Sequence, residues 1–155
     1  MEYKEKLPVG YRWFDTEQIE PLSPFGHGLF YTSFEYSGLK LVEGHISQGP
    51  LLPVEFYVAN TGAREGAEVA QLYVQDPQSS RPRPMKELKG FRKVLLKPGE
   101  KQRVSIPLDN GAFAFYDPQR KGWLAEEGEF RILVGGSSRD IRLNGAFHLP
   151  KTILQ

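Results

Sequence analysis

From residue 34 onward, apolar and polar residues alternate in short runs, which is the spacing of half-buried β-strands. Residues 54–58 and 70–74 show the alternation most clearly, because an apolar residue returns at every second position. Turn residues end both runs, at 60–62 and at 76–77. Shorter runs of the same kind cover 34–41, 113–115, 123–125, 130–134 and 141–149. Seven to nine short strands with turns every ~8 to 12 residues predict an all-β fold, a two-sheet antiparallel sandwich.

A proline-rich connection leads into the middle strand. Two prolines in residues 81–84 fix φ and remove two backbone donors, so this piece must be an extended connection on the surface. After it, Leu88, Val94 and Leu96 are expected on one face of an extended chain. Gly90 stands inside this strand, where a bulge or a close backbone approach is expected.

A tight turn is predicted where this strand ends. In Lys97-Pro98-Gly99-Glu100, proline and glycine occupy the second and third turn positions, the pairing that a type II turn needs. Residues 102–108 alternate again, so the runs on either side of the turn are expected to pair as a hairpin. Beyond them, Asp109 is placed to cap a single helical turn that reaches Ala112.

Residues 1–33 differ from the rest, because large aromatic residues are interleaved with prolines and glycines and no period is visible. The aromatic residues are Tyr3, Tyr11, Trp13, Phe14, Phe25, Phe30 and Tyr31. A large apolar side chain gains roughly 1.5 to 3 kcal/mol when it is buried. We therefore expect this irregular aromatic extension to lie on a surface, either of this chain or of another.

Composition narrows the class of protein. The chain has 155 residues, enough for one domain with a sizeable core. Lys and Arg number 20 and Asp and Glu 19, so no global field favours nucleic acid or a membrane surface as a partner. The absence of cysteine favours the cytoplasm or a periplasm without excluding secretion. No apolar run approaches the ~20 residues that cross a bilayer, and residues 1–8 lack the apolar core of a signal peptide.

No constellation of chemically active residues emerges from the sequence. His27, His45 and His148 are scattered without paired spacing, so we expect no metal site. The glycines that flank His27 lack the third glycine of a dinucleotide fingerprint, and no phosphate loop is present, so no cofactor is expected. Glu126 and Glu127 should point to opposite faces of a strand and do not suit the facing carboxylates of a glycosidase.

The one biased segment is basic and begins with Arg81, Arg83 and Lys86. Such a run of cations could meet phosphates. Its prolines, its alternation across strand faces and its lack of an aromatic stacking platform favour a basic surface loop, either solvated or at the rim of a protein contact.

Several short motifs stand in an order that resembles a known family. They are Val9-Gly10-Tyr11-Arg12-Trp13-Phe14-Asp15, Pro24-Phe25-Gly26-His27-Gly28-Leu29, Val69-Ala70-Gln71-Leu72-Tyr73-Val74, Lys86-Glu87-Leu88-Lys89-Gly90-Phe91, Phe113-Ala114-Phe115-Tyr116-Asp117 and Val134-Gly135-Gly136-Ser137-Ser138-Arg139-Asp140-Ile141. With these residues the chain resembles the C-terminal part of family 3 glycoside hydrolases, the beta-glucosidase and beta-xylosidase group. The fold that this resemblance implies is an immunoglobulin or fibronectin type III-like sandwich.

The resemblance also implies a domain organisation. Residues 1–33 would be the linker and the end of a preceding α/β sandwich domain, 34–150 a fibronectin type III-like domain, and 151–155 a tail. In that family the catalytic aspartate and glutamate lie upstream of everything that matches here, so we expect no catalytic residue in this chain. Because Met1 falls in the middle of a family motif, we expect an excised, designed or truncated chain.

Together, the residues and the resemblance predict a non-catalytic accessory domain that packs against and stabilises the catalytic domains of a beta-glucosidase-like parent. The expected interdomain anchors, or aromatic surface, are Tyr11, Trp13, Phe14, Phe25, His27, Phe30 and Tyr31. The alternative is a polysaccharide- or lignin-binding module that acts through exposed aromatic residues such as Tyr3, Tyr11 or Trp13. A third interpretation, an autonomous glycosidase, has no residues in this chain to carry it.

Overall fold

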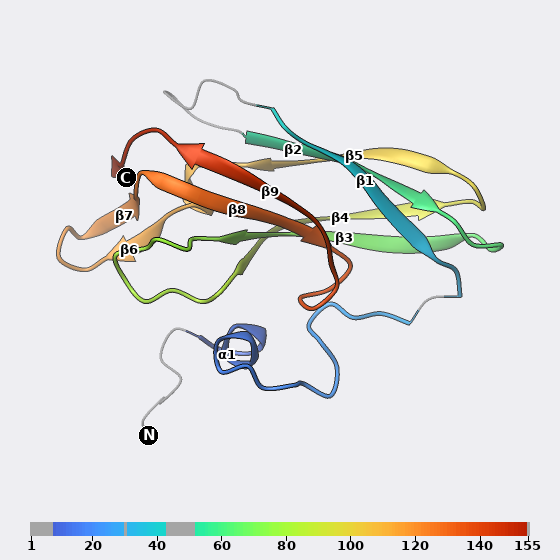
Figure 1. The fold of residues 1–155 in the computed structure, drawn as a ribbon, viewed down its shortest axis with the longest axis horizontal. Helices are drawn as coiled ribbons and strands as arrows, with labels where there is room; N and C mark the ends of the chain where they lie inside the picture. The colour runs from blue at the N-terminus through green and yellow to red at the C-terminus, as the bar shows by residue number, and fades with distance from the viewer. Residues whose placement is uncertain (1–7, 30, 43–51, 155) are drawn as a thin grey trace.

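The computed structural model describes residues 8–29, 31–42 and 52–154, and strands predominate in them (Figure 1). One antiparallel sheet contains, in spatial order, β1 (Phe34–Leu41), β2 (Leu52–Asn60) and β5 (Lys101–Leu108). The facing antiparallel sheet contains β4 (Glu87–Leu96), β3 (Gly66–Gln75), β8 (Gly128–Gly135) and β9 (Ile141–Leu149). A small third sheet contains β10 (Ile153–Leu154), β7 (Gly122–Ala125) and β6 (Phe115–Asp117). The described helices are α1 (Tyr11–Thr16) and the 3-10 turn η1 (Asn110–Ala112), and neither could span a membrane.

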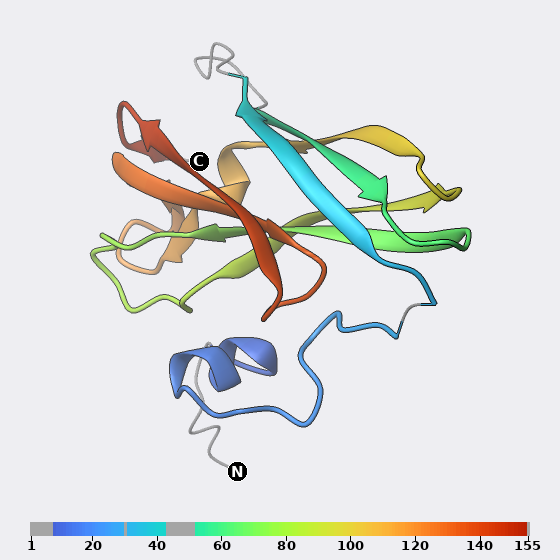
Figure 2. The same ribbon diagram turned by 45° about the vertical axis from the view of Figure 1, so that its right-hand side comes forward.

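The two larger sheets enclose one hydrophobic core, as the views in Figures 1 and 2 show. The alternating apolar positions of 54–58 and 70–74 belong to the same buried cluster. The all-β sandwich predicted from the sequence is therefore confirmed. The single helical turn is confirmed as well, because the Asp109 side chain accepts a hydrogen bond from the Ala112 N–H at 3.0 Å.

The hairpin predicted between β4 and β5 is wrong, although the turn that joins them is as expected. Gly99 has φ +75, and the Glu100 N–H donates to the Lys97 carbonyl at 3.0 Å. β4 pairs with β3 while β5 pairs with β2, so the turn carries the chain from one sheet to the other. Asn60 at the end of β2 fixes this crossing, because its amide donates to the Leu96 carbonyl and its backbone bonds to both Gly99 and Glu100.

The irregularity predicted at Gly90 is confirmed, but it moves Leu88 to the other face of the strand. The register of β4 against β3 shifts between these two residues, which leaves one extra residue in β4. A close approach exists too, since a Cβ on Gly90 would lie 2.5 Å from Ile106 Cγ2. Leu88 lies opposite Tyr73, on the outer face of the sheet, and does not share the core face with the end of the strand as predicted.

The described part of the N-terminal extension lies on the outer face of the four-stranded sheet, with α1 packed against that face (Figure 2). The extension was expected to be irregular throughout, and α1 is the exception. The predicted tail 151–155 contains β10, which pairs with β7. The domain boundaries at 33/34 and 150/151 stay predictions.

A buried carboxyl bridges the two sheets close to the turn between β8 and β9. The Tyr36 hydroxyl of β1 donates to Glu68 Oε1 of β3 at 2.6 Å, and the residue Glu68 is 1% exposed. Glu68 Oε2 is buried without a hydrogen-bond partner among the described residues. The Arg142 guanidinium lies 5.1 Å from the Tyr36 ring centroid. Burial and the charge of Asp140 raise the pKa of Glu68, and the opposing effects of Tyr36 and the Arg142 charge, which lower it, do not cancel this.

This carboxyl should make part of the stability depend on pH. Because the pKa of Glu68 is higher in the folded chain, stability should fall as pH rises from the ordinary glutamate range through that raised value. Each tenfold difference in proton affinity between the folded and unfolded chains corresponds to about 1.4 kcal/mol. Glu68→Gln cannot titrate, so its free energy of unfolding should lack this decline. Urea unfolding from about pH 4 to about pH 8 measures both proteins, with the exposed Glu65→Gln as the matched control. Equal slopes for all three proteins would contradict the prediction.

Candidate functional site

Helix α1 is too short to be stable alone, so contacts with the sheet must hold it. It spans six residues, is preceded by Gly10 with φ 63, and has no side-chain cap on its first turn. Within the helix, the Thr16 hydroxyl donates to the Arg12 carbonyl at 2.7 Å. The helix therefore depends on the side chains that it presents to the sheet, chiefly Tyr11 and Asp15.

Tyr11 anchors the start of α1 on the outer face of the sheet. Its ring stacks on Phe25 with the centroids 4.8 Å apart and meets Tyr73 edge-on at 5.9 Å. Its hydroxyl accepts a hydrogen bond from the Leu88 N–H at 2.7 Å, which satisfies a backbone donor of the edge strand β4. Tyr73 is fully buried under this contact, and burial, followed by the nearby Tyr11 and Asp15, raises the pKa of its hydroxyl.

Gln71 holds the extension further along the chain. Its amide donates to the carbonyls of Gly136 at 2.7 Å and Gly26 at 3.3 Å, and its Oε1 accepts from the Tyr73 hydroxyl at 2.5 Å. Gly26 has φ +79, and a Cβ there would lie 2.2 Å from Gln71 Nε2. A glycine is therefore required where the extension passes over β3.

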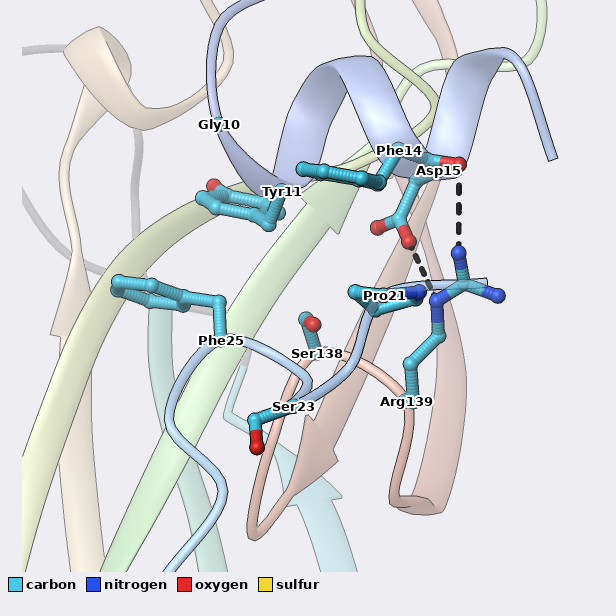
Figure 3. Close-up of a pocket in the computed structure, with 9 residues that line it drawn as sticks. All are labelled: Gly10, Tyr11, Phe14, Asp15, Pro21, Ser23, Phe25, Ser138 and Arg139. Carbon is cyan, nitrogen blue, oxygen red and sulfur yellow. Dashed lines mark hydrogen bonds and ion pairs between the residues drawn. The ribbon is translucent and has the colours of Figure 1, made fainter. Parts of the chain in front are cut away.

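Asp15 brings a negative charge from α1 into a buried position, where two cations neutralise it. Figure 3 shows one of them, Arg139. Lys86 Nζ lies 2.5 Å from its Oδ2, and Arg139 Nε lies 2.8 Å from its Oδ1. Arg139 also donates to the carbonyls of Phe14 and Ile19 at 3.3 and 3.0 Å. One acidic residue thus joins the helix to the loop before β4 and to the turn before β9.

A pocket of about 230 Å³ opens between α1, the stretch that follows it and the β8–β9 turn (Figure 3). It is lined by Gly10, Tyr11, Phe14, Asp15, Pro21, Ser23, Phe25, Ser138 and Arg139. Four of these side chains carry aromatic or proline rings, and the two charged ones form an ion pair with each other. The Ser138 N–H donates to the Phe25 carbonyl at 2.9 Å, which ties the extension to the turn.

The predicted aromatic anchors fall into two groups. Tyr11, Trp13 and Phe14 all lie in α1 and are half-buried. Phe25 and Tyr31 are exposed, although Phe25 also stacks on Tyr11. The structure therefore brings Tyr11, Phe14 and Phe25 together around the pocket, and neither Trp13 nor Tyr31 lines it.

His27 and Phe30 are the remaining predicted anchors. The His27 side chain is exposed, and its backbone N–H donates to the Pro24 carbonyl at 3.0 Å in a turn. Phe30 lies outside the described residues. An anchoring role for either stays a prediction.

Three large apolar side chains of the extension have almost no cover. Leu22 is 104% exposed, Leu29 92% and Tyr31 89%. The backbone around them is nevertheless bound to the sheet through Gly26 and Phe25. The extension is thus fixed to the sandwich and leaves these three apolar side chains in solvent.

The basic loop is less solvated than the sequence suggested. Arg81 is exposed, but Arg83 is largely buried, because it pairs with Asp76 at 3.2 Å and with Glu87 at 2.7 Å. Lys86 is covered as well, by its contact with the helix. Burial acts to raise the pKa of Glu87, but Arg83 and the other nearby cations outweigh it and hold that pKa below its usual value. Neighbouring acidic residues thus pair with Arg83, and the fold brings the distant Asp15 to Lys86.

The charged side chains around the pocket form ion pairs with one another. Both carboxylate oxygens of Asp15 are held by cations of this chain. In the described ranges, no three His, Asp or Glu side chains come together as a metal site would need.

Sequence reasoning missed the residues that receive the extension, which are Gln71, Tyr73 and Arg139. One signal was available in 70–74: the apolar residues of this strand already fill its core-facing positions, yet Gln71 and Tyr73 on the opposite face are an amide and a large ring. Another was Asp15, an acidic residue inside an aromatic stretch of a chain that also has a basic segment.

Comparisons with known proteins agree on one family. Residues 68–138 match the family described as fibronectin type III-like domain. The chain is 52% identical over 153 residues to thermostable beta-glucosidase B of Acetivibrio thermocellus, covering 99% of this chain and 20% of that protein. It is 45% identical over 152 residues to a putative beta-glucosidase of Schizosaccharomyces pombe, covering 97% of this chain and 18% of that protein.

Solved structures show the same likeness. Beta-glucosidase 3B of Thermotoga neapolitana, solved with alpha-D-glucose, superposes with a TM-score of 0.90 at 39% identity, covering 99% of this chain and 21% of that one. A beta-glucosidase of Kluyveromyces marxianus gives a TM-score of 0.91 at 37% identity, covering 98% of this chain and 18% of that one. The chain thus spans about one fifth of the length of these relatives.

Proposed function

Since the chain carries the fibronectin type III-like domain of family 3 beta-glucosidases, we propose that it is a non-catalytic part of such an enzyme, which packs against the catalytic domains and stabilises them. The parent would be a beta-glucosidase-type glycoside hydrolase. The catalytic domains, in the same polypeptide, would be the partner of this chain.

Uncovered apolar side chains on the extension give the main support. Leu22, Leu29 and Tyr31 face solvent on a segment whose other side is fixed to the sandwich. Large apolar side chains left exposed in this way are often found at interaction sites. Covering each of these side chains would contribute roughly 1.5 to 3 kcal/mol to the contact.

The test uses a matched beta-glucosidase in which this chain replaces the corresponding segment, here called the grafted enzyme. We expect the grafted enzyme to hydrolyse nitrophenyl glucoside and the same enzyme without the segment to lose both activity and several degrees of Tm, because its apolar contact surface is left in water. The isolated chain should show no turnover. An enzyme without the segment that keeps its full Tm and activity would refute the proposal.

A second candidate function, binding of polysaccharide or lignin, is favoured by one exposed aromatic pair. Tyr116 and Trp123 lie opposite each other on β6 and β7, about half exposed, with ring centroids 5.8 Å apart. Exposed rings can stack on sugar faces, although such a cross-strand pair also stabilises its own hairpin. Trp123→Ala should release the chain from xylan, cellulose or lignin if the pair binds polymer, whereas Phe91→Ala, at another exposed ring, should not.

A further inference from the structure

The pocket beside α1 has the size of a receptor for one side chain. Its volume is about 230 Å³. An apolar cavity of about 150 Å³ accepts benzene, whereas pockets for small-molecule ligands usually enclose about 300 to 1,000 Å³. One aromatic side chain would fill a pocket of this size.

The charges around the pocket leave nothing to hold an ionic occupant. Asp15 is neutralised by Lys86 and Arg139, and Arg139 is further occupied by the carbonyls of Phe14 and Ile19. Four rings line the pocket beside this ion pair, together with Gly10, Ser23 and Ser138 (Figure 3). An apolar occupant would gain burial there without breaking an ion pair.

Two exposed apolar residues neighbour the pocket lining in the sequence. Val9 precedes the lining residue Gly10, and Leu22 stands between the lining residues Pro21 and Ser23. A pocket for a ring with apolar residues near it is typical of the centre of a protein interface.

We propose that this pocket receives a single aromatic side chain from the catalytic part of the parent enzyme, and that this contact is the main anchor between the two. The inference rests on the function proposed above, because it names the point at which the partner is held. A second copy of this chain is the competing occupant.

The first test asks whether the pocket accepts a ring. Indole is titrated into the isotope-labelled chain, and NMR should show saturable shifts at the backbone amides of Tyr11, Phe14 and Ser138. Ser23→Phe places a ring at the exposed rim, and we expect it to weaken indole binding about tenfold or more. Ser105→Phe, at an exposed position of β5, is the matched control and should leave binding unchanged. Absence of saturable shifts in the unmodified chain would overturn the inference.

The second test uses the grafted enzyme and separates the two proposals. Ser23→Phe should lower its Tm and Ser105→Phe should not. If removal of the whole segment destabilises the enzyme but the two variants behave alike, the pocket inference fails and the accessory function stands. If removal of the segment has no effect, the accessory function itself fails. A concentration-dependent dimer of the isolated chain that Ser23→Phe abolishes would assign the pocket to a second copy and overturn the inference.

Discussion

Replacing Asn60 with alanine is expected to lower the free energy of unfolding by about 3 to 5 kcal/mol, because it removes four hydrogen bonds at a buried position. Its amide donates to the carbonyls of Arg64 at 2.7 Å and Leu96 at 2.9 Å. Its carbonyl oxygen accepts from the Thr32 hydroxyl at 2.6 Å and from the Gly62 N–H at 3.0 Å. The residue is 1% exposed, so water cannot replace these partners in the folded chain.

Two further variants make the Asn60 prediction specific. Asn60→Asp keeps the shape but presents acceptors to the Arg64 and Leu96 carbonyls, and it should be destabilised as well. Asn144→Ala, at an exposed position of β9, should change the free energy of unfolding by less than about 0.5 kcal/mol. Urea unfolding of the three variants measures these differences. A loss at Asn60→Ala no larger than that at Asn144→Ala would show that this network does not hold the crossing between the sheets.

Asp15→Ala is expected to release α1 from the sandwich. Breaking a buried ion pair by removing one partner costs about 3 to 5 kcal/mol, and here Lys86 and Arg139 both lose their carboxylate. The core between the sheets contains no residue of α1, so the sandwich should stay folded while the helix detaches. Trp13 then moves from a half-buried position into water, and its fluorescence should shift to the red.

The Asp15 experiment is cleanest in a Trp123→Phe background, because Trp123 is exposed and would add a constant signal. Glu17→Ala is the matched control, since this residue follows the same helix and is exposed. Limited proteolysis gives a second measurement, and cleavage after Arg12 should accelerate only in Asp15→Ala. Unchanged Trp13 emission and unchanged cleavage in Asp15→Ala would show that other contacts hold α1 on the sheet, namely those of the Tyr11 ring and the Gln71 amide.

Features that depend on neighbouring residues could be predicted from the sequence, and features that depend on residues far away in the chain could not. The turn at 97–100 is specified by its own proline and glycine, so it could be predicted. The partners of the strands that it joins are specified by Asn60 and by the core, which lie far away in the chain, so the hairpin prediction failed. Gly90 indicated a bulge, but the extra residue reverses the faces of the strand before it, which alternation alone cannot reveal.

In the candidate site, too, only the features that depend on neighbouring residues could be predicted. The aromatic composition of the extension was enough to predict that it needs a surface. It could not predict α1, because a helix of six residues has no usable period and exists through Tyr11 and Asp15. Nor could it identify Arg139, whose role depends on a turn that only the folded sheet brings beside the helix.

The crossing at Asn60 also determines how the chain can fold. Because β4 and β5 belong to different sheets, the turn between them cannot nucleate a hairpin. β5 can form its ladder only by pairing with β2, where Leu52 lies opposite Leu108. Pairing over such a distance requires the closure of a long loop before any contact compensates for the lost entropy. We therefore expect refolding of this sandwich to fall in the slow class of about milliseconds to seconds, with the facing edges of β2 and β5 unpaired until the two strands meet.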